Sequence, residues 1–251
     1  MKTLMFAGAA VAALLATAPA SAASQLVLSN DYDGNAFVAG GVTISGTDNG
    51  SVVAIDTVAG ETAAGPRWSG NFFQNTNTGN PAAGTTLTLS NLGAHTGITI
   101  DFVLGFLNSW DGPTGGSAPD YFDLYADNAL LGRFSFSNAA AEAPLLNGAT
   151  IVSQNGQHGG GIFFSDSIVD MSTAAGLTFA HTASSVTFLA QASGEGWQGG
   201  SDESWGIDDL SVTLNGVASA VPEPASWALM IGGFGLVGGA MRRRAARVTF
   251  A

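Results

Sequence analysis

The sequence of 251 residues contains no cysteine and few basic residues. The absence of cysteine excludes disulfide bonds, a thiol nucleophile, thiolate zinc sites and iron–sulfur clusters. Lys2 and the four arginines between positions 242 and 247 lie near the ends, so residues 23–221 contain two arginines and eighteen acids, a net charge of about −16. A surface of this sign repels nucleic acids and anionic lipid head groups and attracts divalent cations.

The sequence also lacks the short motifs of common enzymes. It contains no HExxH and no GxSxG, and its three histidines are scattered, so a zinc hydrolase or serine esterase has no local support. The run GEGWQG at 194–199 has the spacing of a dinucleotide-binding loop, but it opens no helix and no βαβ unit follows. We therefore predict no enzymatic activity. A glycoside hydrolase is the alternative, because eighteen carboxylates offer many possible pairs.

The first 22 residues have the form of a secretory signal peptide. Lys2 precedes an apolar stretch at 4–15, and Ala20 and Ala22 occupy the small positions that signal peptidase requires. The apolar stretch is too short to span a bilayer. We predict an N-terminal signal helix, cleavage after Ala22 and export of the remaining chain.

Apolar and polar residues alternate in several runs, which is the period of half-buried β-strands. These runs lie at 87–89, 98–106, 186–190 and 210–214. Clusters of Gly, Asn, Pro, Ser and Asp at 75–84, 111–120 and 155–161 separate strands. For the domain at 23–221 we predict an all-β fold of ten to thirteen short strands, arranged as a two-sheet antiparallel sandwich of jelly-roll type. A parallel β-helix is the alternative, but no fixed repeat supports it.

The C-terminal segment at 222–251 combines three features in a fixed order. A PEPxxWA motif comes first, an apolar segment at 227–241 follows, and an arginine cluster at 242–247 comes last. The motif and the first arginines are Pro222, Glu223, Pro224, Trp227, Ala228, Arg242, Arg243 and Arg244. This tail resembles the PEP-CTERM sorting signal of Gram-negative bacteria that produce exopolysaccharide. The resemblance implies recognition by an exosortase, a membrane protease that processes the tail.

The apolar segment at 227–241 predicts a short transmembrane helix. A helix of this length rises about 22 Å, which is less than the roughly 30 Å of the hydrocarbon core, so it is a provisional anchor. The arginines hold the C-terminus on the cytoplasmic side and leave the acidic domain outside. A permanent tail anchor is the alternative. We expect the processed protein in the cell envelope, on the cell surface or in the extracellular matrix.

Tails of this kind also carry the label ice-binding protein C-terminal. A face that binds ice needs a flat, regular array of threonine side chains. The TTLTL run at 85–89 is too short to supply one. We therefore do not infer ice binding.

Three segments of the domain resemble bacterial extracellular jelly-roll domains of the lectin-like and carbohydrate-binding kind. They contain Trp-Asp-Gly at 110–112, Asp-Tyr-Phe at 120–122 and Gly-Ile-Asp-Asp at 206–209. The last position is Asp209, where the pattern usually has Asn. The resemblance favours a non-catalytic domain that binds glycan, such as exopolysaccharide. A purely structural matrix protein without a ligand is the alternative.

The closing strand carries a carboxylate that needs a partner. Asp208 shares parity with Leu210, Val212 and Leu214, so it points toward the core unless a bulge intervenes. A buried carboxylate must be hydrogen-bonded, paired or metal-bound. Because the domain has only two arginines, we expect either backbone N–H groups or a hard cation such as Ca²⁺.

The turn NDYDGN at 30–35 is the predicted partner of that carboxylate. The jelly-roll resemblance implies a structural Ca²⁺ that joins an early loop to the final strand. Asp31, Asp33 and Asn35 supply oxygens at the first three positions of a calcium loop. We predict a Ca²⁺ site that uses some of these residues with Asp208 and Asp209. Solvated turn aspartates are the alternative.

A second candidate site lies between the Trp-Asp-Gly and Asp-Tyr-Phe segments. Trp110, Asp111, Asp120 and Tyr121 form a predicted glycan patch, in which an aromatic ring stacks on a sugar and the acids bind its hydroxyls. The alternative is a strand that ends in a turn, with Trp110 half-buried.

Overall fold

The computed structural model describes residues 22–55, 60–114, 118–138, 141–161, 164–218 and 224–243. Contacts group Ala23–Val217 into one compact unit, and the C-terminal helix belongs to a second unit. The predicted signal helix and Ala20 lie outside the described residues. Ala22, after which we predict cleavage, is the first residue of the first strand.

Fourteen strands are described, one more than the upper limit of the prediction. The first seven are β1 (Ala22–Asn30), β2 (Ala36–Val38), β3 (Thr43–Thr47), β4 (Ser51–Ala54), β5 (Asn71–Asn75), β6 (Thr85–Ser90) and β7 (Gly97–Asn108). The other seven are β8 (Tyr121–Ala126), β9 (Ala129–Phe134), β10 (Thr150–Gly156), β11 (Asp166–Asp170), β12 (Thr178–Ala180), β13 (Ser185–Ser193) and β14 (Glu203–Ala218).

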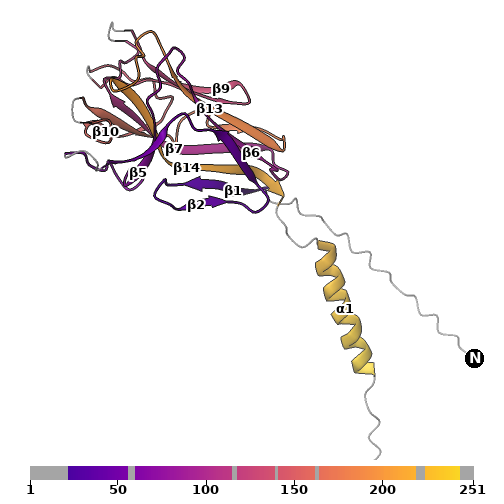
Figure 1. Cartoon of the computed structure of the whole chain (residues 1–251). Coiled ribbons are helices and arrows are strands. Elements are labelled where there is room, and N and C mark those ends of the chain that lie inside the picture. The colour runs from indigo at the N-terminus through magenta and orange to yellow at the C-terminus, as the bar shows by residue number, and fades with distance from the viewer. Residues whose placement is uncertain are drawn as a thin grey trace, which may run out of the picture. The chain divides into compact units, whose positions relative to one another are not determined.

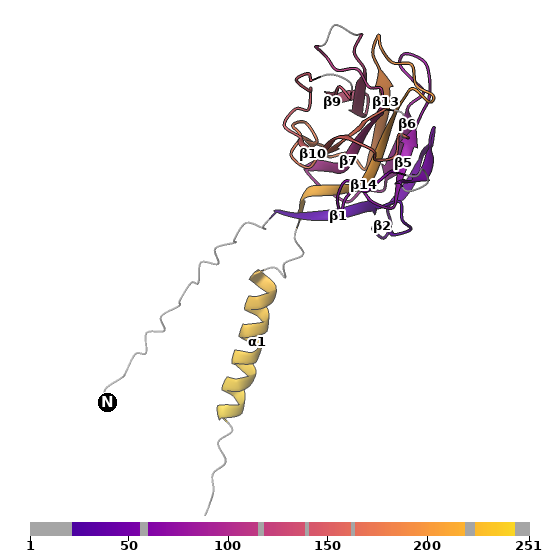
Figure 2. The ribbon, with the colours of Figure 1, turned by 90° about the vertical axis from the view of Figure 1, so that its left-hand side faces the viewer.

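The strands form two sheets, which confirms the predicted antiparallel sandwich. Sheet A has nine strands with the order β10-β11-β7-β14-β1-β2, and β12, β5 and β4 pair beside that path. Sheet B has five strands with the order β3-β6-β13-β8-β9. Neighbours pair antiparallel, as β7 does with β14 and β6 with β13. Both of these pairs can be followed in Figure 1 and, after a quarter turn, in Figure 2.

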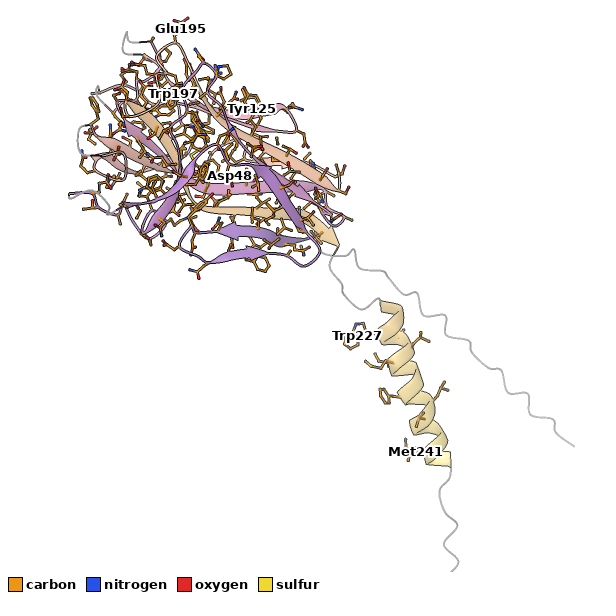
Figure 3. All side chains as sticks on the ribbon, viewed as in Figure 1. Asp48, Tyr125, Glu195, Trp197, Trp227 and Met241 are labelled. Atoms are coloured by element: carbon orange, nitrogen blue, oxygen red, sulfur yellow. The ribbon has the colours of Figure 1, made fainter. Side chains whose placement is uncertain are left out.

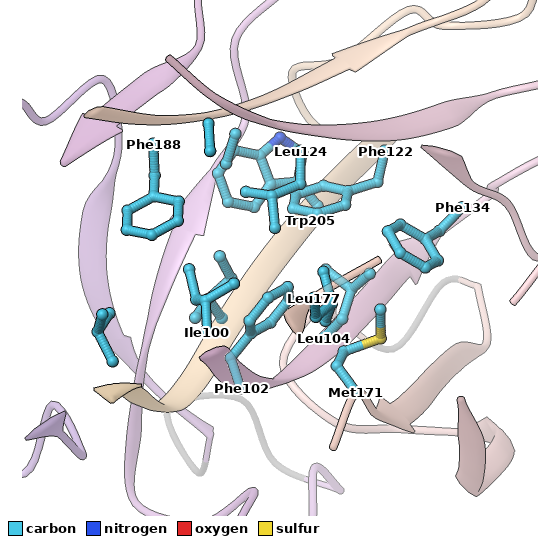
Figure 4. Close-up of a cluster of buried hydrophobic side chains, with 14 of the residues drawn as sticks. Ile100, Phe102, Leu104, Phe122, Leu124, Phe134, Met171, Leu177, Phe188 and Trp205 are labelled. Atoms are coloured by element: carbon cyan, nitrogen blue, oxygen red, sulfur yellow. The ribbon is translucent and has the colours of Figure 1, made fainter. Parts of the chain in front are cut away.

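The main core lies between the two sheets. On β7 the predicted alternation holds, because Ile98, Ile100, Phe102, Leu104 and Phe106 are all buried against sheet B. Figure 4 shows the rings of Phe122 and Trp205 side by side in this core, and their centroids lie 5.1 Å apart. Burying each large apolar side chain of this kind contributes about 1.5–3 kcal/mol, so the inner faces of the two sheets stabilise the fold.

The outer face of sheet A is also covered. Trp68 and Phe72 pack on this face against Val103, which belongs to a second buried cluster. Gly105 lies opposite Gly206 in the sheet, and a Cβ atom on Gly105 would meet the Trp68 ring at 2.5 Å. Glycine is therefore required where the indole ring packs against the sheet.

A bulge in β14 decides where Asp208 points. The register with β7 shifts between Asp208 and Ser211, and Asp209 adopts a left-handed φ of 49°. Ile207 therefore faces the main core while Asp208 lies opposite Val103 on the outer face, 3% exposed. The bulge that the prediction named as an exception does intervene, so Asp208 lies on the outer face, although its side chain is buried.

The C-terminal helix α1 runs from Pro224 to Arg243. Proline is tolerated in the first turn because its missing N–H has no partner there in any helix. Large apolar side chains such as Leu229 and Leu236 are 77% and 78% exposed, and Figure 3 labels Trp227 and Met241 on this helix.

No helix among the described residues is both long and apolar enough to cross a membrane. The helix over 227–241 is confirmed, but its prediction as a transmembrane helix is not supported. Pro222, Glu223 and Arg244 lie outside the described residues, and Arg242 is exposed in the last turn.

Candidate functional site

Three acidic side chains meet at one end of the sandwich. Asp111 follows β7, Asp120 immediately precedes β8, and Glu203 is the first residue of β14. Each offers an oxygen, and these oxygens lie within 4.8 Å of one another. Among the described residues this is the one place where three or more potential metal ligands gather so closely. We call these three residues the Asp120 triad.

Backbone N–H groups hold one oxygen of each buried acid in the triad. The N–H of Asp111 donates to Oδ2 of Asp120 at 2.7 Å, and the N–H of Gln198 donates to Oε2 of Glu203 at 2.6 Å. The second oxygens, Oδ1 of Asp120 and Oε1 of Glu203, are buried and have no hydrogen-bond partner in the described part of the chain. Asp120 is 0% exposed and Glu203 1% exposed, so each buried carboxylate is only half satisfied.

The pKa of each carboxylate in the triad is raised, and burial is the largest cause in all three. Burial raises the pKa of Asp120 most, and the charges of Glu203 and Asp111 raise it further against the opposing N–H of Asp111. Burial also raises the pKa of Glu203, with contributions from the charges of Asp202 and Asp111. Burial therefore makes the charged form of these carboxylates costly unless a cation compensates it.

The predicted calcium residues of the first loop are satisfied from within the chain. Oδ1 of Asp31 accepts the N–H groups of Asp33 and Asn35 at 3.0 Å, and its Oδ2 accepts the amide of Asn35 at 2.8 Å. Oδ1 of Asp33 accepts the backbone N–H and the side-chain amide of Asn71, both at 2.8 Å. The turn is an Asx turn closed by its own donors.

Asp208 is also held by backbone donors. Its oxygens accept the N–H of Asp209 at 2.7 Å and the N–H of Ser69 at 3.2 Å. Burial raises its pKa to about 7, and the charges of Asp209 and Asp33 act in the same direction. Asp33 is thus near enough to Asp208 to interact electrostatically, while the Ca²⁺ site predicted for these residues stays a prediction. We call Asp31, Asp33, Asp208 and Asp209 the Asp208 group.

Arg67 neutralises the outer edge of that group. Its guanidinium bonds Asp209, Asp170 at 2.8 Å and Asp101 at 3.0 Å, which lie on β14, β11 and β7. One arginine therefore joins three neighbouring strands of sheet A. The sequence predicted backbone N–H groups or a cation for Asp208, and in the structure Asp208 has backbone donors while Arg67 binds its neighbour Asp209.

Trp110 is not part of a glycan patch. Its side chain is 0% exposed, its indole N–H donates to the carbonyl of Ser204, and its ring packs edge-on against Phe106 and Trp197. A ring with no exposed surface cannot stack on a sugar, so this part of the prediction is wrong. Of the four predicted residues, Asp111 and Asp120 belong to the triad and Tyr121 lines a surface groove.

A polar groove of about 630 Å³ lies on the outer face of sheet B. Tyr121, Asp123 and Tyr125 alternate along β8 and share this face, and Arg133 lies opposite Asp123 on β9. The rim is formed by the 191–195 segment and by Asn80, whose amide donates to the carbonyl of Gly194 at 2.6 Å. Figure 3 labels Tyr125 and Glu195, two of its lining residues.

The groove is held in shape by one ion pair. Arg133 binds both oxygens of Asp123 at 2.6 and 2.8 Å, and the Ser193 hydroxyl donates to the same carboxylate at 2.8 Å. The Arg133 carbon Cζ lies 4.6 Å from the centroid of the Tyr121 ring. The side chain of Tyr125 forms no hydrogen bond within the described residues, so its ring and hydroxyl are available to a ligand.

Rows of hydroxyl side chains extend the same face beyond the groove. Thr43, Ser45 and Thr47 on β3 lie opposite Ser90, Thr88 and Thr86 on β6. Thr187 on β13 adds to them, and its hydroxyl hydrogen-bonds that of Thr88 at 2.9 Å. The TTLTL run is thus one row of an array that spans three strands, which spacing in a single segment does not reveal.

A second cavity of about 510 Å³ opens between the sheets. Its lining is mostly apolar and reaches Phe102, Leu124 and Trp205, while Tyr32 and Asp48 also line it. It lies on the opposite side of sheet B from the polar groove, because alternate residues of β8 line the two hollows.

Two of the scattered histidines meet in the fold. Nε2 of His95 and Nδ1 of His181 lie 2.8 Å apart, and Nε2 of His181 lies 3.2 Å from a carboxylate oxygen of Asp127. His158 is separate, within hydrogen-bonding distance of Ser153 and the carbonyl of Thr62. Each ring thus has partners within the fold.

Comparison with known proteins bears first on the tail. The pattern of the PEP-CTERM protein-sorting motif matches residues 220–244. The chain carries a PEP-CTERM sorting motif. This motif indicates an exported protein that an exosortase, a membrane protein, processes, and it indicates sorting to the cell surface or extracellular matrix.

The other comparisons concern the whole chain. No curated protein matches the sequence. Among solved structures, one similar chain is the N-terminal CBM22-1–GH10 modules of endo-1,4-β-D-xylanase 10B from Clostridium thermocellum, solved with xylohexaose. The identity is 10%, the TM-score is 0.27, and the match covers 70% of this chain. The chain spans only 28% of that protein.

Proposed function

We propose that this protein is a surface or exopolysaccharide-matrix protein whose sandwich binds a neutral glycan without cleaving it. The observation that carries the proposal is the groove on the outer face of sheet B, where Tyr121 and Tyr125 lie beside the Arg133–Asp123 pair. A groove of this size, with aromatic surface and a few fixed polar groups, is typical of small-ligand sites.

Preorganisation supports binding at this place. Asp123 and Arg133 hold each other in a two-point contact, so a ligand need not order those side chains. Tyrosine offers a rigid ring and a hydroxyl at a small entropic cost. The hydroxyl rows on β3, β6 and β13 continue on the same face and give a polymer chain further surface to contact.

Charge supports a neutral ligand. The domain at 23–221 sets two arginines against eighteen acids, and Arg133 is already paired with Asp123. An anionic polysaccharide would be repelled by the remaining acids, most strongly at low salt. A neutral polysaccharide experiences no such repulsion.

The lack of catalysis in the proposal rests on burial. Glycoside hydrolysis needs two carboxyl groups that flank the scissile bond. The closest cluster of carboxylates among the described residues is the Asp120 triad, where Asp120 and Glu203 are 0% and 1% exposed. A sugar cannot reach two acids buried in this way.

Glycan binding is tested with the full chain in mild detergent, by affinity electrophoresis against the exopolysaccharide of the producing cell and a panel of neutral polysaccharides. We expect Tyr125→Ala to weaken binding at least tenfold, because the free ring of the groove is removed while the Arg133–Asp123 pair remains. The matched control is Phe37→Ala, which removes a 46% exposed ring on β2 in the other sheet and leaves binding unchanged.

The same samples separate the alternatives. Equal weakening by Tyr125→Ala and Phe37→Ala would move the binding site away from the groove. Release of new reducing ends would make the protein a glycan-active hydrolase. No binding to any polysaccharide would leave a purely structural matrix protein.

The role of the tail is tested by removing residues 222–251 and following the protein in cell fractions. We expect the truncated chain to leave the envelope and accumulate in the medium, because the exosortase has nothing to recognise. An unchanged distribution together with an unchanged mature mass would contradict the sorting role.

A further inference from the structure

The Asp120 triad is an arrangement of like charges with no compensating cation in the described residues. Asp111, Asp120 and Glu203 come from three separate segments, yet their oxygens lie within 4.8 Å of one another. Two of the three side chains are fully buried and each keeps one unpartnered oxygen. Burying an unpaired carboxylate is costly, so a fold that brings three together needs a positive partner.

Neither arginine of the domain can serve as that partner. Arg67 is bound to Asp101, Asp170 and Asp209, and Arg133 is bound to Asp123. The remaining acids near the triad add to the negative charge, because both Glu142 and Asp202 interact with Asp111. The positive charge must therefore come from outside the domain.

Each of the two buried carboxylates has one oxygen outside its backbone hydrogen bonds. Oδ2 of Asp120 and Oε2 of Glu203 are fixed by the N–H groups of Asp111 and Gln198. The two carboxyl groups are close enough for a direct side-chain interaction with each other. The N–H groups thus act as outer supports that hold each carboxylate with its second oxygen available to an ion.

We propose that Asp111, Asp120 and Glu203 bind one Ca²⁺ ion. Calcium accepts carboxylate oxygens at 2.3–2.6 Å in flexible geometry, so oxygens on opposite sides of the ion lie up to about 5 Å apart. The 4.8 Å spread of the triad fits this range. Mg²⁺ fits less well, because it keeps several waters and two of the three acids are fully buried.

The ion would join the two sheets at one end of the sandwich. Asp111 extends β7 and Glu203 begins β14, both in sheet A, whereas Asp120 leads into β8 of sheet B. Asp120 also directly precedes Tyr121 of the polar groove. Calcium binding therefore holds Asp111 and Asp120 together, whether or not the groove binds a glycan.

The test uses the full chain in mild detergent, first stripped with a chelator and then titrated with CaCl₂. Isothermal titration calorimetry should give one Ca²⁺ per chain. The unfolding temperature should rise by about 5–10 °C at a hundredfold excess over Kd, because the ion binds the folded state. MgCl₂ at the same concentration should produce a smaller rise.

Two variants locate the ion. Asp111→Asn changes a partly exposed side chain and should weaken Ca²⁺ binding at least tenfold without unfolding the chain. Glu203→Gln keeps an oxygen for the N–H of Gln198, removes the charge and should have the same effect. The matched control Asp31→Asn, in the turn that closes on itself, should bind Ca²⁺ as the unmodified chain does.

Three outcomes would overturn the proposal. The first is an unmodified chain that neither binds Ca²⁺ nor gains thermal stability, which would leave a proton shared between Asp120 and Glu203 as the solution. The second is binding that Asp31→Asn abolishes and Asp111→Asn preserves. The third is a folded Glu203→Gln chain with unchanged affinity.

Discussion

Two groups of acids in this domain place carboxylates close together in partly or fully buried positions, and the two groups differ in how the cost of that burial is compensated. In the Asp208 group, backbone N–H groups and Arg67 satisfy the carboxylates, and the turn at Asp31 closes on its own donors. In the Asp120 triad, N–H groups satisfy only half of each buried carboxylate, and no arginine approaches among the described residues. Whether a group of carboxylates needs a cation therefore depends less on the number of acids than on the number of hydrogen-bond donors around them.

The largest effect within this comparison is expected for Arg67→Ala. The variant leaves Asp101, Asp170 and Asp209 without their shared cation on three neighbouring strands. Because these side chains are 25–44% exposed, we expect a loss of about 2 kcal/mol rather than the larger cost of a fully buried pair. Thermal unfolding should show a fall of about 4–8 °C.

Arg67→Lys is the control for charge alone. Lysine keeps the positive charge but cannot bind three carboxylates at once. The stability of Arg67→Lys should therefore lie between those of the unmodified chain and Arg67→Ala. If Arg67→Ala is as stable as the unmodified chain, then Asp101, Asp170 and Asp209 need no cation. The contrast with the triad would then disappear.

The next effect concerns pH and Asp208. The folded-state pKa of Asp208 is raised to about 7 from an ordinary 3.8, so the folded chain holds the proton more tightly than the unfolded chain. The resulting stability is present below about pH 4 and is lost as pH rises through about 7. We expect Asp208 to lower the free energy of unfolding as the pH rises across that window.

Asp208→Asn isolates this contribution from those of other groups. The difference in unfolding free energy between the variant and the unmodified chain, measured by urea denaturation at several pH values, should change between pH 4 and 7 in favour of the variant. A constant difference would show that Asp208 keeps an ordinary pKa and that backbone donors satisfy it fully.

The smallest effect is expected for Asp31→Asn. The asparagine oxygen can still accept the N–H groups of Asp33 and Asn35, so the turn should persist. The unfolding temperature should shift by about 1 °C, by the same amount with chelator and with Ca²⁺. A shift that appears only in Ca²⁺ would return the calcium site to the first loop.

Sequence reasoning succeeded where the signal was local. The alternation over 98–106 predicted β7, and the short runs elsewhere predicted β6, β13 and β14. These strands were predictable because successive side chains of a half-buried strand alternate between the core and the solvent. The tail was equally local, since its motif, apolar segment and arginines follow one another in the chain.

Sequence reasoning failed where the outcome depended on register or on distant segments. Because of the bulge after Asp208, that side chain lies on the outer face, and no residue pattern in the sequence predicted the bulge. Trp110 looked like a loop residue but is buried by Trp197 and capped by Ser204, which follow it by almost ninety residues or more. Asp111, Asp120 and Glu203 were brought together by the same folding of distant segments.

The contrast between the two acid groups can be decided by locating the ion directly. Crystals of the full chain grown with terbium in place of calcium would give an anomalous difference map, in which a bound ion appears as a strong peak. The account predicts one peak per chain, among the carboxylates of Asp111, Asp120 and Glu203. A peak beside Asp31 and Asp33, or no peak at either group, would contradict it.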